Sequence, residues 1–109
     1  MHELAIAESV VSTVLERTGG RVVSVVRLRV GQLAGVVPDA LTFSFEVATA
    51  GTALEGSSLE IEVLPGRAHC RSCSDDFALD DALLLCPCGS ADVELLSGRE
   101  LALQSVEVA

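Results

Sequence analysis

Four cysteines form two close pairs late in the chain, Cys70 with Cys73 in CRSC and Cys86 with Cys88 in CPCGS. The pattern is C-x2-C-x12-C-x-C. Two close pairs separated by a short spacer can surround one tetrahedral cation with four thiolates, and Gly89 allows a tight turn after the second pair. The pattern therefore predicts a structural zinc site. Such a site has no open coordination position, so it explains a fold and not a catalytic function.

The four cysteines could also form two disulfides, or CRSC could be a redox-active dithiol. Two disulfides would need an oxidising compartment, and the N-terminus has neither the basic nor the apolar segment of a secretory signal. A redox dithiol in CRSC would ordinarily begin a helix after a strand, and no helical pattern follows here. The single residue inside CPC is tighter than the usual two-residue spacing. It leaves open whether Cys88 or the neighbouring His69 completes the site.

The other histidine, His2, stands beside the α-amine of Met1. The amine, the amide nitrogen of His2 and its imidazole can close five- and six-membered chelate rings on one cation. Ni(II) and Cu(II) favour planar, nitrogen-rich ligand sets. Glu3 can neutralise the cation or hydrogen-bond the imidazole, or it can simply place a negative charge in the first turn of a helix. The alternative is that His2 is an accidental surface residue that binds no metal.

Composition excludes several classes of function. The chain of 109 residues has a net charge of −9 and contains no lysine, which argues against a nucleic-acid partner. It has no apolar run of about 18 residues that could cross a membrane, and we expect it to be cytoplasmic. It has no glycine-rich phosphate loop, and a closed zinc site with two distant histidines does not support hydrolysis. We therefore expect no enzyme.

Periodic apolar residues predict the elements that position these groups. A first helix is predicted from Glu3 to Arg17 and a second over VPDALTFSFEVATAGT, with Pro38 in its first turn. The apolar residues expected to be buried on the two helices are Leu4, Ala7, Val11, Val14 and Leu15, and then Val37, Leu41, Phe45 and Ala48. Strands are predicted over RVVSVVRLRVG, SSLEIEVLP and RELALQSVEVA. The inward residues of the first two strands are Val22, Val26, Leu28 and Val30, and then Leu59, Ile61 and Val63.

The fold expected from this order is α+β, with two helices packed on a small, mostly antiparallel sheet and an inserted zinc-ribbon-like module. The first domain would comprise residues 1–65 plus 99–109 and carry His2. The zinc-binding module would comprise residues 66–98. Between the cysteine pairs, alternating apolar residues predict a two-stranded ribbon through Phe77, Leu79, Leu83 and Leu85.

Four stretches of the sequence together resemble the HypA family, the nickel metallochaperones of [NiFe]-hydrogenase maturation. They are MHELAIAESVV, VRLRVGQLAGVVPDALTFSFE, the four-cysteine module and SGRELALQSVEV, and they cover essentially the whole chain. The resemblance implies that His2, with backbone nitrogens and Glu3, binds Ni(II). It also implies that zinc is held by Cys70, Cys73, Cys86 and Cys88, although members of the family commonly carry C-x2-C at both pairs.

The resemblance further implies a cytoplasmic chaperone that hands nickel to the hydrogenase large subunit with help from a GTPase partner. In some organisms such proteins also serve urease. The sequence also leaves open that the chain forms a weak homo-oligomer. The alternative function is a non-catalytic zinc-ribbon adaptor for protein interaction, in which His2 has no role.

Overall fold

The computed structural model describes residues 2–80 and 83–109. The chain divides into two compact units. The first comprises Met1–Leu28, Val36–Glu62 and Ala102–Ala109, and the second comprises Arg29–Gly35 and Val63–Leu101. No helix in the described part of the chain is long and apolar enough to cross a membrane.

Helix α1 spans Glu3–Thr18 in the first unit. Its buried residues are Ala7, Val11 and Val14, which recur at helical spacing as predicted. Leu4 was also expected to be buried, but it is 45% exposed because it lies in the first turn, at the end of the stripe. The helix ends at Gly19, whose φ of 62° is the left-handed conformation that glycine adopts without strain.

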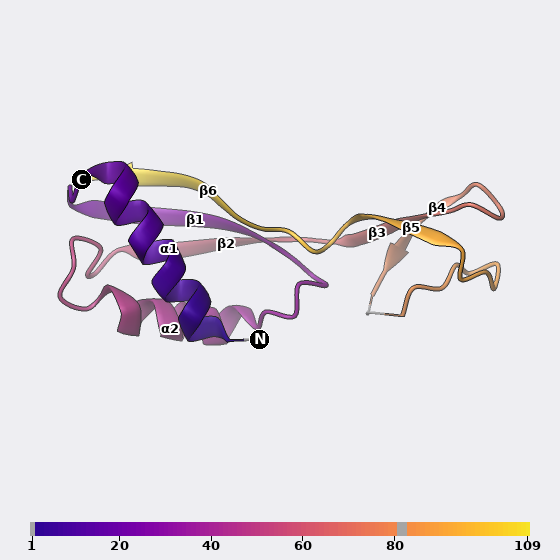
Figure 1. The fold of residues 1–109 in the computed structure, drawn as a ribbon, viewed down its shortest axis with the longest axis horizontal. Coiled ribbons are helices and arrows are strands. Elements are labelled where there is room, and N and C mark those ends of the chain that lie inside the picture. The colour runs from indigo at the N-terminus through magenta and orange to yellow at the C-terminus, as the bar shows by residue number, and fades with distance from the viewer. Residues whose placement is uncertain (1, 81–82) are drawn as a thin grey trace. The chain divides into compact units, whose positions relative to one another are not determined.

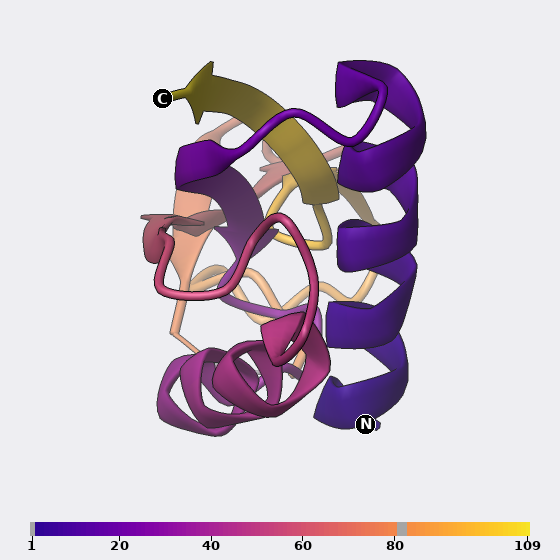
Figure 2. The same cartoon turned by 90° about the vertical axis from the view of Figure 1, so that its left-hand side faces the viewer.

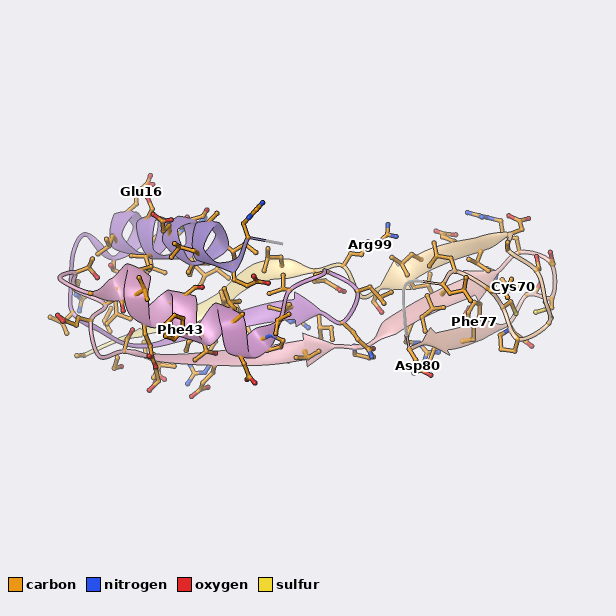
Figure 3. All side chains as sticks on the ribbon, turned by 90° about the horizontal axis from the view of Figure 1, so that it is seen from below. Glu16, Phe43, Cys70, Phe77, Asp80 and Arg99 are labelled. Carbon is orange, nitrogen blue, oxygen red and sulfur yellow. The ribbon has the colours of Figure 1, made fainter. Side chains whose placement is uncertain are left out.

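Helix α2 spans Pro38–Thr49 and buries Leu41, Phe45 and Thr49. Pro38 occupies the first helical position, where its missing N–H leaves no hydrogen bond unmade. The prediction was wrong at Val37, which is 58% exposed because it precedes the helix as its N-cap and does not share the helical period. Phe43, labelled in Figure 3, is on the outer side of α2 and is 67% exposed.

A three-stranded sheet has the order β2-β1-β6. Its strands are β1 (Val23–Gly31), β2 (Ser58–Leu64) and β6 (Leu101–Val108). Strands β1 and β2 run in the same direction, joined through α2, whereas β6 runs antiparallel to β1 (Figure 1). Within the first unit, α1 and α2 lie on the same side of the strands (Figure 2).

The core of the first unit lies between this side of the sheet and the helices. Val26 and Leu28 are fully buried, as the alternation predicted, and so is Leu54 from the loop after α2. Val22 was expected on this face, but it is 62% exposed and Val23 is buried in its place. The loop after α2 lies beside this end of the strand, where the carbonyl of Ala53 accepts a hydrogen bond from the amide of Val23 (3.1 Å).

On the opposite face of this sheet, Arg27 joins the two outer strands. Its Nε lies 2.9 Å from Glu60 of β2 and its Nη2 lies 2.6 Å from Glu107 of β6. The two carboxylates raise the pKa of Arg27, so the guanidinium stays charged. On the polar face of the sheet, ion pairs therefore connect β1 with both of its neighbouring strands.

The second unit contains a second sheet, with the order β4-β3-β5. Strand β3 (Gly66–Cys70) pairs antiparallel with both β4 (Asp76–Leu79) and β5 (Val93–Ser97). The predicted ribbon through Leu83 and Leu85 is wrong. The amide of Leu85 bonds to the carbonyl of Leu83 (3.0 Å), a three-residue turn that an extended strand does not contain. The partner of β4 is β3.

Residues 29–35 belong to the second unit although they lie far from it in sequence. Three backbone amides of this segment donate to backbone carbonyls: Gly31 to Glu100 (2.7 Å), Gln32 to Leu64 (2.8 Å) and Leu33 to Gly98 (2.6 Å). These bonds attach the segment where β3 begins and β5 ends, which is one end of this antiparallel strand pair. A methyl group on Gly31 would meet the carbonyl of Gly98 at 2.1 Å, so this approach requires glycine.

Candidate metal centre

Four thiols meet where two short loops of the second unit face each other. Cys70 is the last residue of β3 and Cys73 follows in the turn after it, whereas Cys86 and Cys88 lie in the loop that leads to β5. All four sulfur atoms lie within 4.8 Å of one another. In residues 2–80 and 83–109 this is the one group of three or more His, Cys, Asp or Glu side chains that could hold a metal ion.

The sulfur separations fit a tetrahedral zinc ion. A Zn–S bond of about 2.3 Å places two ligands of a tetrahedron roughly 3.8 Å apart. The Sγ atoms of Cys70 and Cys88 are 3.8 Å apart, and those of Cys73 and Cys86 are 3.7 Å apart. These distances are far longer than a disulfide bond of about 2.0 Å. The four residues therefore fit a closed, four-thiolate site, and Cys88 occupies its position despite the short CPC spacing.

The first loop is shaped by backbone bonds around its leading cysteine. The amide of Cys70 bonds to Asp75 (2.8 Å), and Ser74 takes a left-handed φ of 66° to close the turn. The amide of Cys73 points at the sulfur of Cys70 (3.5 Å). Backbone amides directed at sulfur stabilise the thiolate form.

The second loop repeats this plan with one residue fewer. The amide of Cys86 bonds to Ser90 (2.9 Å), Gly89 takes the left-handed φ of 97°, and the amide of Cys88 points at the sulfur of Cys86 (3.4 Å). The hydroxyls of Ser72 and Ser90 are 2.8 Å apart and connect the two loops. The short spacing is therefore accommodated by a glycine turn.

The surroundings shift the pKa values of two of these thiols in opposite directions. The amide of Cys73 is the largest influence on Cys70 and lowers the pKa of this thiol to about 6. The amide of Cys88 lowers the pKa of Cys86, but burial and the neighbouring thiols outweigh it and raise the pKa to about 12. Four clustered thiols do not all ionise by themselves because their negative charges repel. A bound dication would remove this conflict by stabilising every thiolate.

His69 is not brought into the thiol cluster. Neighbouring residues of a strand point to opposite faces, and Cys70 is fully buried whereas His69 is half-buried. Its Nδ1 lies 2.6 Å from a carboxylate oxygen of Asp76, its register partner on β4. Nothing in the sequence marks Asp76 as this partner, because the pairing depends on the register of β3 with β4.

The residues predicted at the N-terminus lie in the first unit. His2 is exposed and is the N-cap of α1, and its carbonyl accepts the amide of Ile6 (3.1 Å). Its side chain makes no capping hydrogen bond. The carboxylate of Glu3 accepts the amide of Val37 at 3.2 Å, and this bond is the largest cause of the lowered pKa of Glu3. Sequence reasoning missed Val37 because 34 residues separate the two partners.

Comparisons with known proteins match the chain over almost its whole length. The family model HypA, described as hydrogenase/urease nickel incorporation metallochaperone, matches residues 1–108. The hydrogenase maturation factor HypA of Streptomyces avermitilis is 50% identical over 112 residues, which cover 97% of this chain and 86% of the relative. HypA of Geobacter metallireducens is 45% identical over 109 residues, which cover 99% of both chains.

Two solved structures share the fold. A solution structure of a HypA protein has a TM-score of 0.68 at 22% identity, covering 100% of this chain and 97% of that one. The nickel metallochaperone HypA of Helicobacter pylori has a TM-score of 0.65 at 20% identity, covering 99% and 97%. Since the family model and the alignments to curated relatives cover almost the whole chain, the chain belongs to the HypA family of hydrogenase and urease nickel-incorporation metallochaperones.

Proposed function

We propose that this protein is a nickel metallochaperone that binds Ni(II) at its N-terminus and delivers it for maturation of [NiFe]-hydrogenase. His2 supplies the imidazole, and the terminal amine and backbone nitrogens complete a nitrogen-rich set with Glu3 beside it. The observation that carries the proposal is the family match from residue 1 together with the exposed His2 side chain, which makes no capping bond at the start of α1. Exposed ligands suit a carrier because its cargo must leave again.

The proposal gives zinc a separate and structural role. Cys70, Cys73, Cys86 and Cys88 would hold Zn(II), which supplies the positive charge that joins the two loops. The sulfur separations of 3.7 and 3.8 Å support this assignment. A filled four-thiolate site has no coordination position for nickel chemistry, so the cargo would bind at the N-terminus.

The partners in this proposal are a GTPase of hydrogenase maturation and the hydrogenase large subunit, met in the cytoplasm. The net charge of −9 suits a partner with a basic or metal-rich face.

Nickel titration of the wild type beside His2→Ala, with bound zinc assayed in parallel, tests the proposal. We expect about one nickel per chain in the wild type, a marked loss of affinity in His2→Ala, and unchanged zinc in both. His69→Ala is the matched control and should bind nickel like the wild type, because its imidazole is paired with Asp76. Equal nickel affinity in the wild type and His2→Ala would instead favour the zinc-ribbon adaptor.

A further inference from the structure

The contact of Glu3 with Val37 suggests a specific role for the glutamate. Glu3 is the first residue of α1, and its Oε2 accepts the amide of Val37, the N-cap of α2. The bond therefore joins the beginnings of two helices. Both belong to the first unit, so their mutual placement lies within one compact body.

Helix α2 has few means of satisfying its own first amide groups. Val37 has no polar side chain with which to cap the helix, and no side-chain capping bond is made at this position. Pro38 has no N–H to satisfy. In a capping box, a glutamate three residues into a helix accepts the amide of that helix's own N-cap residue. Glu3 makes the same bond from a different helix.

The bond also has a favourable electrostatic setting. The N-termini of α1 and α2 both carry partial positive charge, and one carboxylate lies at both of them. The pKa of Glu3 is lowered chiefly by the amide of Val37, in agreement with a carboxylate held in its charged form. Asp39 also lies in the first turn of α2, where its negative charge is favoured in the same way.

We infer that Glu3 is a positioning residue, which caps α2 in trans and thereby fixes the first turn of α1 next to His2, and that its carboxylate is not a nickel ligand. This inference rests on the proposed function, because it specifies how Glu3 serves the nickel site. The connection to His2 is direct, since His2 precedes Glu3 and its carbonyl closes the first turn of α1. Without the bond to Val37, this turn would lose a hydrogen bond to the beginning of α2.

Glu3→Gln and Glu3→Ala distinguish positioning from ligation. Glutamine keeps the length of the side chain and an oxygen that can accept the Val37 amide, but it is a poor replacement for a carboxylate ligand. We expect Glu3→Gln to bind nickel within about threefold of the wild type and to retain slow hydrogen exchange at the Val37 amide. Glu3→Ala should bind nickel at least tenfold more weakly and exchange this amide faster. Glu8→Ala, an exposed glutamate on the same helix, is the control and should change neither quantity.

Each outcome decides the inference. If Glu3→Gln loses nickel as strongly as Glu3→Ala while the Val37 amide stays protected, the carboxylate acts on the metal and the inference is wrong. It is also wrong if Glu3→Ala leaves the Val37 amide protected. Helical circular dichroism and zinc content show whether Glu3→Ala is folded. If the wild type itself does not bind nickel, the proposed function fails, and the exchange of the Val37 amide still tests the trans cap.

Discussion

At the scale of single residues, protons compete with the metal for the nitrogen ligands proposed at the N-terminus. Imidazole and amine nitrogens bind a metal only through a free lone pair, so metal affinity falls as the pH falls. We therefore expect the nickel affinity of the zinc-loaded protein to fall on mild acidification, from neutral pH to about 6. Calorimetric titrations at several pH values measure this. An affinity that stays level across the range would indicate carboxylate or thiolate ligands.

Glu3 gives a second pH dependence, this time of the metal-free fold. Its pKa in the folded protein lies below the value of 4.5 that it has when unpaired. The unfolded state therefore takes up the proton first on acidification. The stabilisation is present above about pH 4.5 and is lost as the pH falls through the lowered pKa of the folded state. Denaturant unfolding at pH 6 and pH 3.5 should show a larger loss of stability in the wild type than in Glu3→Gln. Equal losses would mean that this carboxylate does not contribute.

At the scale of elements, α2 offers two phenylalanines in opposite environments. Phe45 is 2% exposed in the core, whereas Phe43 is 67% exposed on the same helix. Phe45→Ala should lower the free energy of unfolding by about 3–5 kcal/mol, because it removes apolar contacts and leaves a cavity. Phe43→Ala should change it by no more than about 0.5 kcal/mol. Chemical denaturation of the two variants provides the comparison, and similar costs at both positions would contradict the assignment of the buried face.

Two glycines with positive φ make a matched pair in the second unit. Gly98 has a φ of 120° and a methyl group there would meet the Cα of Gly66 at 2.8 Å, whereas Gly89 has a φ of 97° and open space. Alanine at either position is strained by about 1–2 kcal/mol. Gly98→Ala should cost about 1–3 kcal/mol more, because the backbone must also move apart. Denaturant unfolding of the zinc-loaded variants would contradict this expectation if Gly89→Ala were the more costly change.

At the scale of the whole molecule, the two units should depend on zinc to different degrees. Removing zinc with a chelator, or changing Cys73 to Ala, should speed hydrogen exchange throughout β3, β4 and β5, because the coordination bonds that would hold the two cysteine loops together are lost. The amides of Gly31 and Leu33 should exchange faster too, since they bond to Glu100 and Gly98 within the second unit. Exchange in α1 and α2 should change little. Readdition of zinc is the control, and simultaneous loss of protection in both units would contradict independent folding.

Much of the fold could be predicted because it depends on local periodicity. The spacing of Ala7, Val11 and Val14 is enough to define the buried stripe of α1. Glycine after Thr18 and proline at position 38 mark helix ends through backbone chemistry that needs no tertiary contact. The cysteine spacing is equally local, since each pair lies within one short loop. The α+β class, the two helices and the clustering of the four thiols follow from such patterns.

The tertiary structure decided what depends on residues distant in the sequence. The bond from the Val37 amide to Glu3 has no sequence signal, because a backbone amide is present at almost every residue. The assignment of residues 29–35 to the second unit arises from bonds to Leu64, Gly98 and Glu100, which only strand register brings near. The same holds for Val23, which is buried in place of Val22 and whose amide bonds to the carbonyl of Ala53 in a loop distant in sequence. Local spacing determines which residues can act together along one element, and packing between elements determines which of them meet.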